Sequence, residues 1–292
     1  MIAENSNEEY KSKNELAFYK HLLYRKTFKF FFDIPSYNLN DVSQEFEKEF
    51  LNLDIVQLDE IIKIMKEKDF FNKLNYKFLN ISTKIVDKII YITPGLTAQF
   101  FEKKIDYREF GISTCTPDQI VELYKDCYEM IATMIPIIEM INNIKYRQKY
   151  NNYINDDWNI EKSINDTNGN KIKSLNYGEY FSTLFSKKLN KCIRNSIGHN
   201  DYIYDSITQK IIFKDKNKEE EMYLIEFVIE CINTILTLIN MENLFFYLER
   251  RKLYVEGERS KLVLTEYKRK FERNEKCPCG SGEKYKKCHG NN

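Results

Sequence analysis

The sequence predicts a mainly α-helical protein, organised as a helical bundle with one short β-hairpin and a small zinc-binding tail. Apolar residues recur at helical spacing through most of the chain, and only nine glycines and five prolines interrupt its 292 residues. Cysteine and histidine gather near the C-terminus. We expect an N-terminal helical region at 1–112, a helical domain at 113–250, a basic connector at 251–275 and a zinc knuckle at 276–292.

The first 112 residues are expected to form successive helices, and nothing in them assigns a role. The segments with helical apolar spacing are 15–32, 39–49, 55–66 and 70–92. The apolar face of the third segment consists of Ile55, Leu58, Ile62 and Met65. The fourth segment is expected to stop at Pro94-Gly95, because this pair ends helices. Residues 100–116 are expected to be irregular.

The central domain is expected to begin with a long helix at Thr116-Pro117-Asp118, which places proline in the first turn. This helix should run to about Tyr150 and be kinked at Pro136. Residues 151–176 are rich in Asn, Asp and Ser and are expected to form a polar loop. Trp158, the only tryptophan, is expected to anchor that loop.

A second helix, a hairpin and a third helix are expected to complete this domain. Residues 178–197 carry an apolar stripe at helical spacing, and residues 202–205 and 210–213 resemble two hairpin strands. Residues 219–247 predict a long helix that is apolar around most of its circumference. Such a helix is buried in a bundle or at a subunit interface. Residues 249–275 are expected to be a partly helical connector.

The C-terminal metal-ligating residues are Cys277, Cys279, Cys288 and His289. Three thiolates and one imidazole suit a tetrahedral structural Zn²⁺. Pro278, Gly280 and Gly282 let the intervening loop fold back on itself. Metal binding would supply the folding energy that so short a segment lacks. Because all four ligand positions are filled, we expect a closed structural site and not a catalytic metal.

This tail resembles the SEC-C motif, a small zinc knuckle found at the C-termini of many bacterial proteins. Glu283 stands where that motif usually has a basic residue, but it lies outside the ligand set. The resemblance implies a docking module that meets a protein or ribosome partner.

A second group of chemically capable residues is Arg194, Asn195 and His199, at the end of the helix predicted for 178–197. Gly198 is expected to cap that helix where the chain turns. A planar charged fork beside a group that titrates near neutral pH suits phosphate chemistry. The spacing alone, however, favours a structural interpretation, in which His199 caps the helix and Arg194 is a surface residue.

In its context, before a hairpin and a long apolar helix, this motif resembles that of the HEPN superfamily, over residues 116–248. Its ribonucleases carry an Arg, a polar residue and a His a few positions further on, and Arg194, Asn195 and His199 match them. The resemblance implies a metal-free site where motifs from two subunits meet. His199 would activate the ribose 2′-hydroxyl or protonate the leaving oxygen. Arg194 would hold the scissile phosphate and neutralise its charge. Asn195 would orient Arg194 or His199 by a hydrogen bond.

Two further observations bear on this resemblance. The helix predicted for 219–247 has more apolar surface than one bundle face needs, which suits a homodimer. The polar segment 151–176 departs from the pattern of the family.

Composition limits the other classes of function. Lys and Arg number 45 against 44 Asp and Glu, so net charge argues neither for nor against nucleic acid. Between 249 and 289 basic residues outnumber acidic ones by about two to one, which favours polyanions locally. The remaining cysteines, expected to be reduced and mostly buried, are Cys115, Cys127, Cys192 and Cys231. A polar N-terminus and the absence of an apolar run of membrane-spanning length predict a cytoplasmic protein without a membrane partner.

We therefore expect a metal-independent endoribonuclease that cleaves tRNA, rRNA or mRNA at a homodimer interface, acting as a bacterial toxin or an anti-phage abortive-infection effector. The alternative is a non-catalytic helical adaptor that docks a partner through the zinc knuckle. A metalloenzyme using the C-terminal site is disfavoured, since four protein ligands leave no position for substrate.

Overall fold

The computed structural model describes residues 27–29, 31–32, 39–100, 106–185, 189–257, 272–276 and 283–288. Within these residues the protein is mainly helical, with one three-stranded antiparallel sheet. This confirms the predicted fold class at the level of a mainly α protein.

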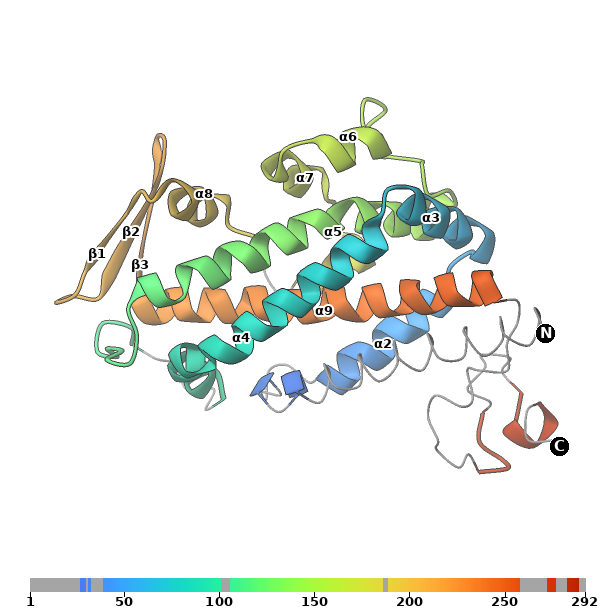
Figure 1. The fold of residues 1–292 in the computed structure, drawn as a ribbon, viewed down its shortest axis with the longest axis horizontal. Helices are drawn as coiled ribbons and strands as arrows, with labels where there is room; N and C mark the ends of the chain where they lie inside the picture. Colours follow the sequence, from blue (N-terminus) through green and yellow to red (C-terminus); the bar gives the residue numbers. More distant parts are fainter. Residues whose placement is uncertain are drawn as a thin grey trace.

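The longest helices of the described chain form the centre of the molecule. They are α4 (Phe70–Phe100), α5 (Val121–Arg147) and α9 (Leu224–Gly257). They lie side by side, and α4 crosses α5 and α9 (Figure 1). α5 is buried around most of its circumference and contains Pro136 in its interior. A helix that is apolar on all sides needs neighbours on all sides, which this arrangement supplies.

α9 lies in the core of the chain, which was one of the two places expected for it. Its residues Leu224–Leu253 are long and apolar enough to cross a membrane by length and composition, so the expectation that no run reaches that length is wrong. However, 83% of the most apolar window is buried inside the protein. The surplus apolar surface is therefore used within one subunit and gives no support to a dimer.

The helices α2 (Leu39–Leu51) and α3 (Ile55–Glu67) confirm two of the predicted segments. α3 begins at Asp54, whose Oδ1 accepts hydrogen bonds from two backbone N–H groups at 2.9 Å. Its buried residues are Leu58, Ile61, Ile62 and Met65, whereas Ile55 in the first turn is exposed. Residues 27–29 and 31–32 are helical, and the rest of the predicted helix 15–32 lies outside the described residues.

The N-terminal helices and the central domain share one hydrophobic core. Phe46 of α2 packs against Phe181 and Tyr247, with ring centroids 5.8 and 5.4 Å apart. Phe78 of α4 packs against Phe245 of α9 at 5.5 Å. The predicted boundary near residue 112 therefore separates two stretches of sequence that bury their side chains together.

α4 continues through Pro94-Gly95 to Phe100, so the predicted stop is wrong. Gly95 lies so close to α9 that a Cβ atom there would be 2.6 Å from Val228 Cγ1. This close packing stabilises the helix at the point where proline removes a backbone donor. Tertiary contact here overrides the local sequence signal.

The segment 151–176 is not an unstructured loop, because it contains the short helices α6 (Ile160–Asn165) and α7 (Asn168–Ser174). Asn159 caps α6 by accepting from Lys162 N at 3.0 Å, and Thr167 caps α7 by accepting from Asn170 N at 3.4 Å. The polar residues that indicate a loop in the sequence are thus partly helix caps. We call residues 151–176 the polar excursion.

The prediction of one helix over residues 178–197 is also wrong, since two separate elements occupy this segment. They are a 3₁₀ helix, Tyr180–Leu184, and α8 (Lys191–His199). Asn190 begins α8, because its Oδ1 accepts from Cys192 N at 2.9 Å and from Ile193 N at 3.3 Å. The apolar residues on both sides are buried, which explains why they produce one continuous stripe.

The predicted hairpin is present but belongs to a three-stranded sheet. Its strands are β1 (Tyr202–Asp205), β2 (Lys210–Asp215) and β3 (Lys218–Tyr223), in that order. β3 takes the place of the first turn of the helix predicted to start at Glu219. Lys210 pairs with Glu221 across β2 and β3, and Lys214 lies 3.4 Å from Glu219. The acidic run is therefore matched to lysines of a neighbouring strand.

Candidate functional site

α8 carries all three residues of the predicted catalytic motif. The helix begins at its Asn190 cap and ends at His199. Asn200 adopts the left-handed conformation, with φ of 54°, and its N–H donates to Ile197 O at 3.1 Å. The predicted cap at Gly198 is therefore wrong by two residues, because asparagine also tolerates this conformation. The end of α8 packs against β2 (Figure 1).

Arg194 is held by a chain of charged and polar side chains. Its Nε donates to Glu129 Oε1 at 2.6 Å, and its Nη2 also contacts this carboxylate. Nη1 donates to Asn195 Oδ1 at 3.1 Å, and Asn195 Nδ2 donates to Asp215 Oδ2 at 2.9 Å. Asn168, in α7, donates to the other oxygen of Glu129. We call these five residues the Arg194 network.

This network is open to solvent and retains binding capacity. The side chains of Arg194 and Glu129 are 30% and 33% exposed. A guanidinium has five N–H donors, and these contacts occupy three of them. Within the described part of the chain two donors remain, which is enough for a bidentate phosphate contact. Glu129 and Asp215 make the surroundings of Arg194 acidic, so a phosphate would compete with a carboxylate for it.

His199 lies at the exposed end of α8 and makes no hydrogen bond or ion pair with another described residue. Residues five apart on a helix point about 140° away from each other. A Cβ at Gly198 would be 3.8 Å from Arg194 Nη1, so the guanidinium follows the helix face that contains Gly198. The structure therefore joins Arg194 to Asn195 and leaves His199 on a different face.

The zinc-binding tail is described only in part. Cys288 is half-buried and follows the 3₁₀ helix Tyr285–Lys287. Cys277, Cys279 and His289 lie outside the described residues. Lys276 and Lys284 form a β-bridge, and Tyr285 N donates to Glu275 O at 2.7 Å. These contacts close the loop between residues 276 and 284, which suits ligands from both of its ends.

The other cysteines are buried and free, as predicted. Burial raises the pKa of Cys115 to about 11 and that of Cys231 to about 12. It also raises the pKa of Cys127 and Cys192. Such thiols are poor nucleophiles and poor metal ligands at neutral pH. Within the described part of the chain, no group of three or more His, Cys, Asp and Glu residues is placed to hold a metal.

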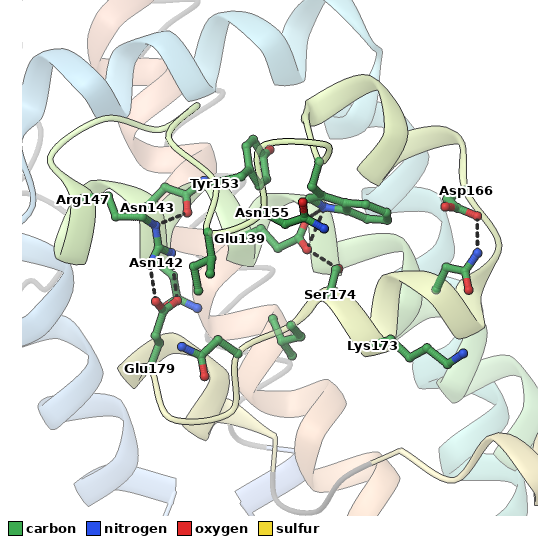
Figure 2. Close-up of a pocket in the computed structure, with 15 residues that line it drawn as sticks. Glu139, Asn142, Asn143, Arg147, Tyr153, Asn155, Asp166, Lys173, Ser174 and Glu179 are labelled. Carbon is green, nitrogen blue, oxygen red and sulfur yellow. Dashed lines mark hydrogen bonds and ion pairs between the residues drawn. The ribbon is translucent and has the colours of Figure 1, made fainter.

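A pocket, which the sequence did not predict, lies between α5 and the polar excursion. Figure 2 shows Glu139 of α5 at its centre with Ser174 beside it. Trp158 also lines the pocket. Glu139 is only 5% exposed. Trp158 Nε1 donates to its two oxygens at 3.2 and 3.3 Å, and Ser163 and Ser174 donate as well. Burial raises the pKa of Glu139, although these donors oppose the shift.

Two sequence features indicate this pocket in retrospect. Glu139 interrupts the apolar run from Ile135 to Ile141, and a lone carboxylate on a buried helix needs partners. Trp158 is the only tryptophan, and it lies in the polar excursion. The prediction that Trp158 anchors this segment is confirmed by its hydrogen bonds to Glu139.

Comparison with known proteins identifies the tail. The SEC-C motif, a motif of the zinc-binding type, matches residues 273–291. The protein translocase subunit SecA of Ehrlichia ruminantium (strain Welgevonden) is 78% identical over 23 residues. That match covers 8% of this chain and 3% of the SecA protein. No solved structure matches. The SEC-C resemblance is therefore confirmed for the tail alone.

Proposed function

We propose that the protein is a cytoplasmic, metal-independent endoribonuclease of the HEPN type. The observation that carries the proposal is Arg194, partly exposed on α8 with two N–H donors that no other described residue uses, next to Asn195 and before His199. An arginine that a protein orients on one side and leaves open on the other suits the binding of a phosphodiester.

The chemistry follows from the properties of the three side chains. Arg194 binds the scissile phosphate and neutralises the charge that develops on it. His199, which is exposed to solvent, takes the proton of the ribose 2′-hydroxyl or gives one to the leaving 5′-oxygen. Asn195 orients Arg194, since its Oδ1 accepts from Nη1. The products are a 2′,3′-cyclic phosphate and a 5′-hydroxyl.

A composite site between two subunits is part of this proposal. Arg194 and His199 point away from each other on one α8, so one copy presents a phosphate-binding group and an acid–base group to different sides. Two copies related by a twofold axis let Arg194 of one face His199 of the other. The homodimer rests on this geometry, because the apolar surface of α9 is covered within the chain.

The tail completes the proposal as a docking module. Cys277, Cys279, Cys288 and His289 would hold Zn²⁺, and the closed loop between Lys276 and Lys284 fits this arrangement. Zn²⁺, when bound, supplies a structural crosslink and no catalytic position. The tail would bring the enzyme to a protein or ribosome partner, where tRNA, rRNA or mRNA is cut. This is consistent with a toxin or abortive-infection effector.

The test is cleavage of total RNA by the purified protein in the presence of EDTA. We expect cutting by the parent and none by His199→Ala. Cys288→Ser is the matched control, because it removes a tail ligand and should leave cutting of free RNA unchanged. Equal cutting by the parent and His199→Ala contradicts the assignment of the site.

The second candidate is a non-catalytic adaptor, and one observation favours it. Arg194 already has an internal partner in Glu129, as a structural arginine would. In this case the helical body is a scaffold and only the SEC-C tail makes a functional contact. An adaptor would show no RNA cleavage under any condition, and Arg194→Ala would lower its stability.

A further inference from the structure

The pocket between α5 and the polar excursion has the size and construction of a small-ligand site. Its volume is about 380 Å³, within the range of known ligand pockets. One wall is Glu139 with Trp158 and Ser174, which donate to it. The opposite wall is Arg147, which forms an ion pair with Glu179 and donates from Nε to Asn143 Oδ1 at 2.8 Å (Figure 2).

The carboxylates of this pocket are already satisfied. Glu139 accepts from Trp158, Ser163 and Ser174, and Glu179 is paired with Arg147. Asp166 Oδ1 accepts from Thr167 N at 2.6 Å and from Asn170 Nδ2 at 2.8 Å. The pocket therefore has little remaining capacity to bind a cation.

The remaining capacity is that of hydrogen-bond donors. The hydroxyl of Tyr153 is buried and has no hydrogen-bond partner among the residues that the structure describes. Burial raises the pKa of this phenol, so the hydroxyl keeps its proton. The Nδ2 atoms of Asn155 and Asn176 and the Nζ of Lys173 donate to no other described residue. An occupant that brings oxygen or ring-nitrogen acceptors would satisfy these groups.

The pocket also offers flat aromatic surface. Trp158 and Tyr153 line it together with the apolar side chains of Ile154 and Leu175. Aromatic side chains bind the faces of planar rings, and every nucleobase has such a face. We propose that this pocket binds a nucleobase, presented by a free mononucleotide. The base lies against Trp158 and Tyr153, the amides meet its edge acceptors, and Lys173 meets the phosphate.

α7 connects this pocket to the Arg194 network. Ser174, at the end of α7, donates to Glu139, and Asn170 and Lys173 line the pocket. Asn168, at the start of the same helix, donates to Glu129, the partner of Arg194. A nucleotide that moves or fixes α7 would change the hold of Glu129 on Arg194. This consequence rests on the proposed function, whereas the binding itself does not.

Trp158 makes the test specific to this pocket, because the chain has no other tryptophan. UMP, CMP, AMP and GMP are each titrated into the full-length protein while its tryptophan fluorescence is recorded, with calorimetry as a second readout. We expect a saturable change with at least one of them and none with ribose 5-phosphate, which lacks a base. No saturable change with any mononucleotide overturns the proposal, as does equal binding of ribose 5-phosphate.

Tyr153→Phe separates ligand binding from a structural role. The hydroxyl has no partner among the described residues, so its removal should leave the thermal unfolding midpoint unchanged or higher. Affinity for the mononucleotide should fall by roughly fivefold to tenfold. The control Tyr76→Phe, on the exposed face of α4, should change neither quantity. Unchanged affinity in Tyr153→Phe contradicts the proposal.

A short single-stranded RNA distinguishes the source of the base. We expect it to bind through the Arg194 network without occupying the pocket, so that the mononucleotide still produces its full change in Trp158 fluorescence when the RNA is present. If the RNA changes this fluorescence and free mononucleotides do not, the pocket holds a base of the substrate and the proposal of a free nucleotide fails. Since these readouts need no RNA cleavage, the pocket and the nuclease can fail separately.

Discussion

Two glutamates of α5, Glu129 and Glu139, accept hydrogen bonds from opposite ends of α7, from Asn168 and from Ser174. Glu129 is partly exposed and pairs with the charged Arg194. Glu139 is buried and accepts only from neutral donors, and its pKa is raised by burial. An exposed ion pair can exchange a partner for a ligand at little cost, whereas a buried carboxylate that closes a network cannot. We therefore expect substitution of Glu129 to act mainly on the proposed phosphate site and substitution of Glu139 to act mainly on stability.

The largest expected effect is on catalysis, at the exposed cluster. His199→Ala should lower RNA cleavage by about 10²-fold or more, as expected for loss of a general acid–base group. Stability should change by less than about 0.5 kcal/mol, because His199 contacts no other described side chain through a hydrogen bond. Cleavage kinetics and denaturant unfolding of the same preparations check both statements. If His199→Ala lowered stability without lowering cleavage, His199 would be a structural residue and not a catalytic one.

The next effect is on stability, at the buried cluster. Glu139→Ala should lower the free energy of unfolding by about 3 kcal/mol, because Trp158, Ser163 and Ser174 lose their acceptor in a buried site. Urea unfolding measures it. The control is Glu161→Ala, which removes the exposed ion pair between Glu161 of the polar excursion and Lys68. It should change the free energy of unfolding by less than about 0.5 kcal/mol. Equal losses in the two variants would show that Glu139 has no special role.

A third effect concerns the affinity for RNA. Glu129→Gln removes a negative charge beside Arg194 and keeps a hydrogen-bond acceptor. We expect KM for RNA to fall several-fold, since the phosphate no longer competes with a carboxylate. Steady-state kinetics at two salt concentrations measure it, and the effect should shrink at the higher one. A rise in KM would mean that Glu129 positions Arg194 more than it opposes phosphate.

The smallest effect is a dependence of stability on pH. Burial raises the pKa of Glu139 in the folded state above its unfolded value, so the folded protein holds this proton more tightly. The stability linked to this group is therefore present below the unfolded pKa and is lost as pH rises through the folded pKa. The slope is at most about 1.4 kcal/mol per pH unit. Unfolding of the parent and Glu139→Gln between pH 4 and 7 measures it, and a difference that grows in favour of the parent as pH rises would contradict the assignment.

The sequence predicts the long helices well, because a buried face imposes its period on the residues. α3 and α5 begin within a few residues of the predicted positions, at the Asp54 cap and after Pro117. The predictions are wrong where the same polar residues fit two different structural roles. Asn190 starts a new helix inside an apolar stripe, and the acidic run 219–221 belongs to β3, whose lysine partners lie on β2.

The candidate sites differ in the same way. Arg194 and Asn195 are adjacent in sequence, so a local motif is enough to find them. The pocket joins residues from 139 to 179, and no local pattern encodes that closure. Only Glu139 in its apolar run and the lone Trp158 indicate it in the sequence.

The central claim is tested most directly by sequencing RNA 5′-hydroxyl ends after induction of the parent and of Arg194→Ala in bacterial cells. The account predicts new 5′-hydroxyl ends at defined positions with the parent and their loss with Arg194→Ala. The same ends at the same frequency in both would contradict it.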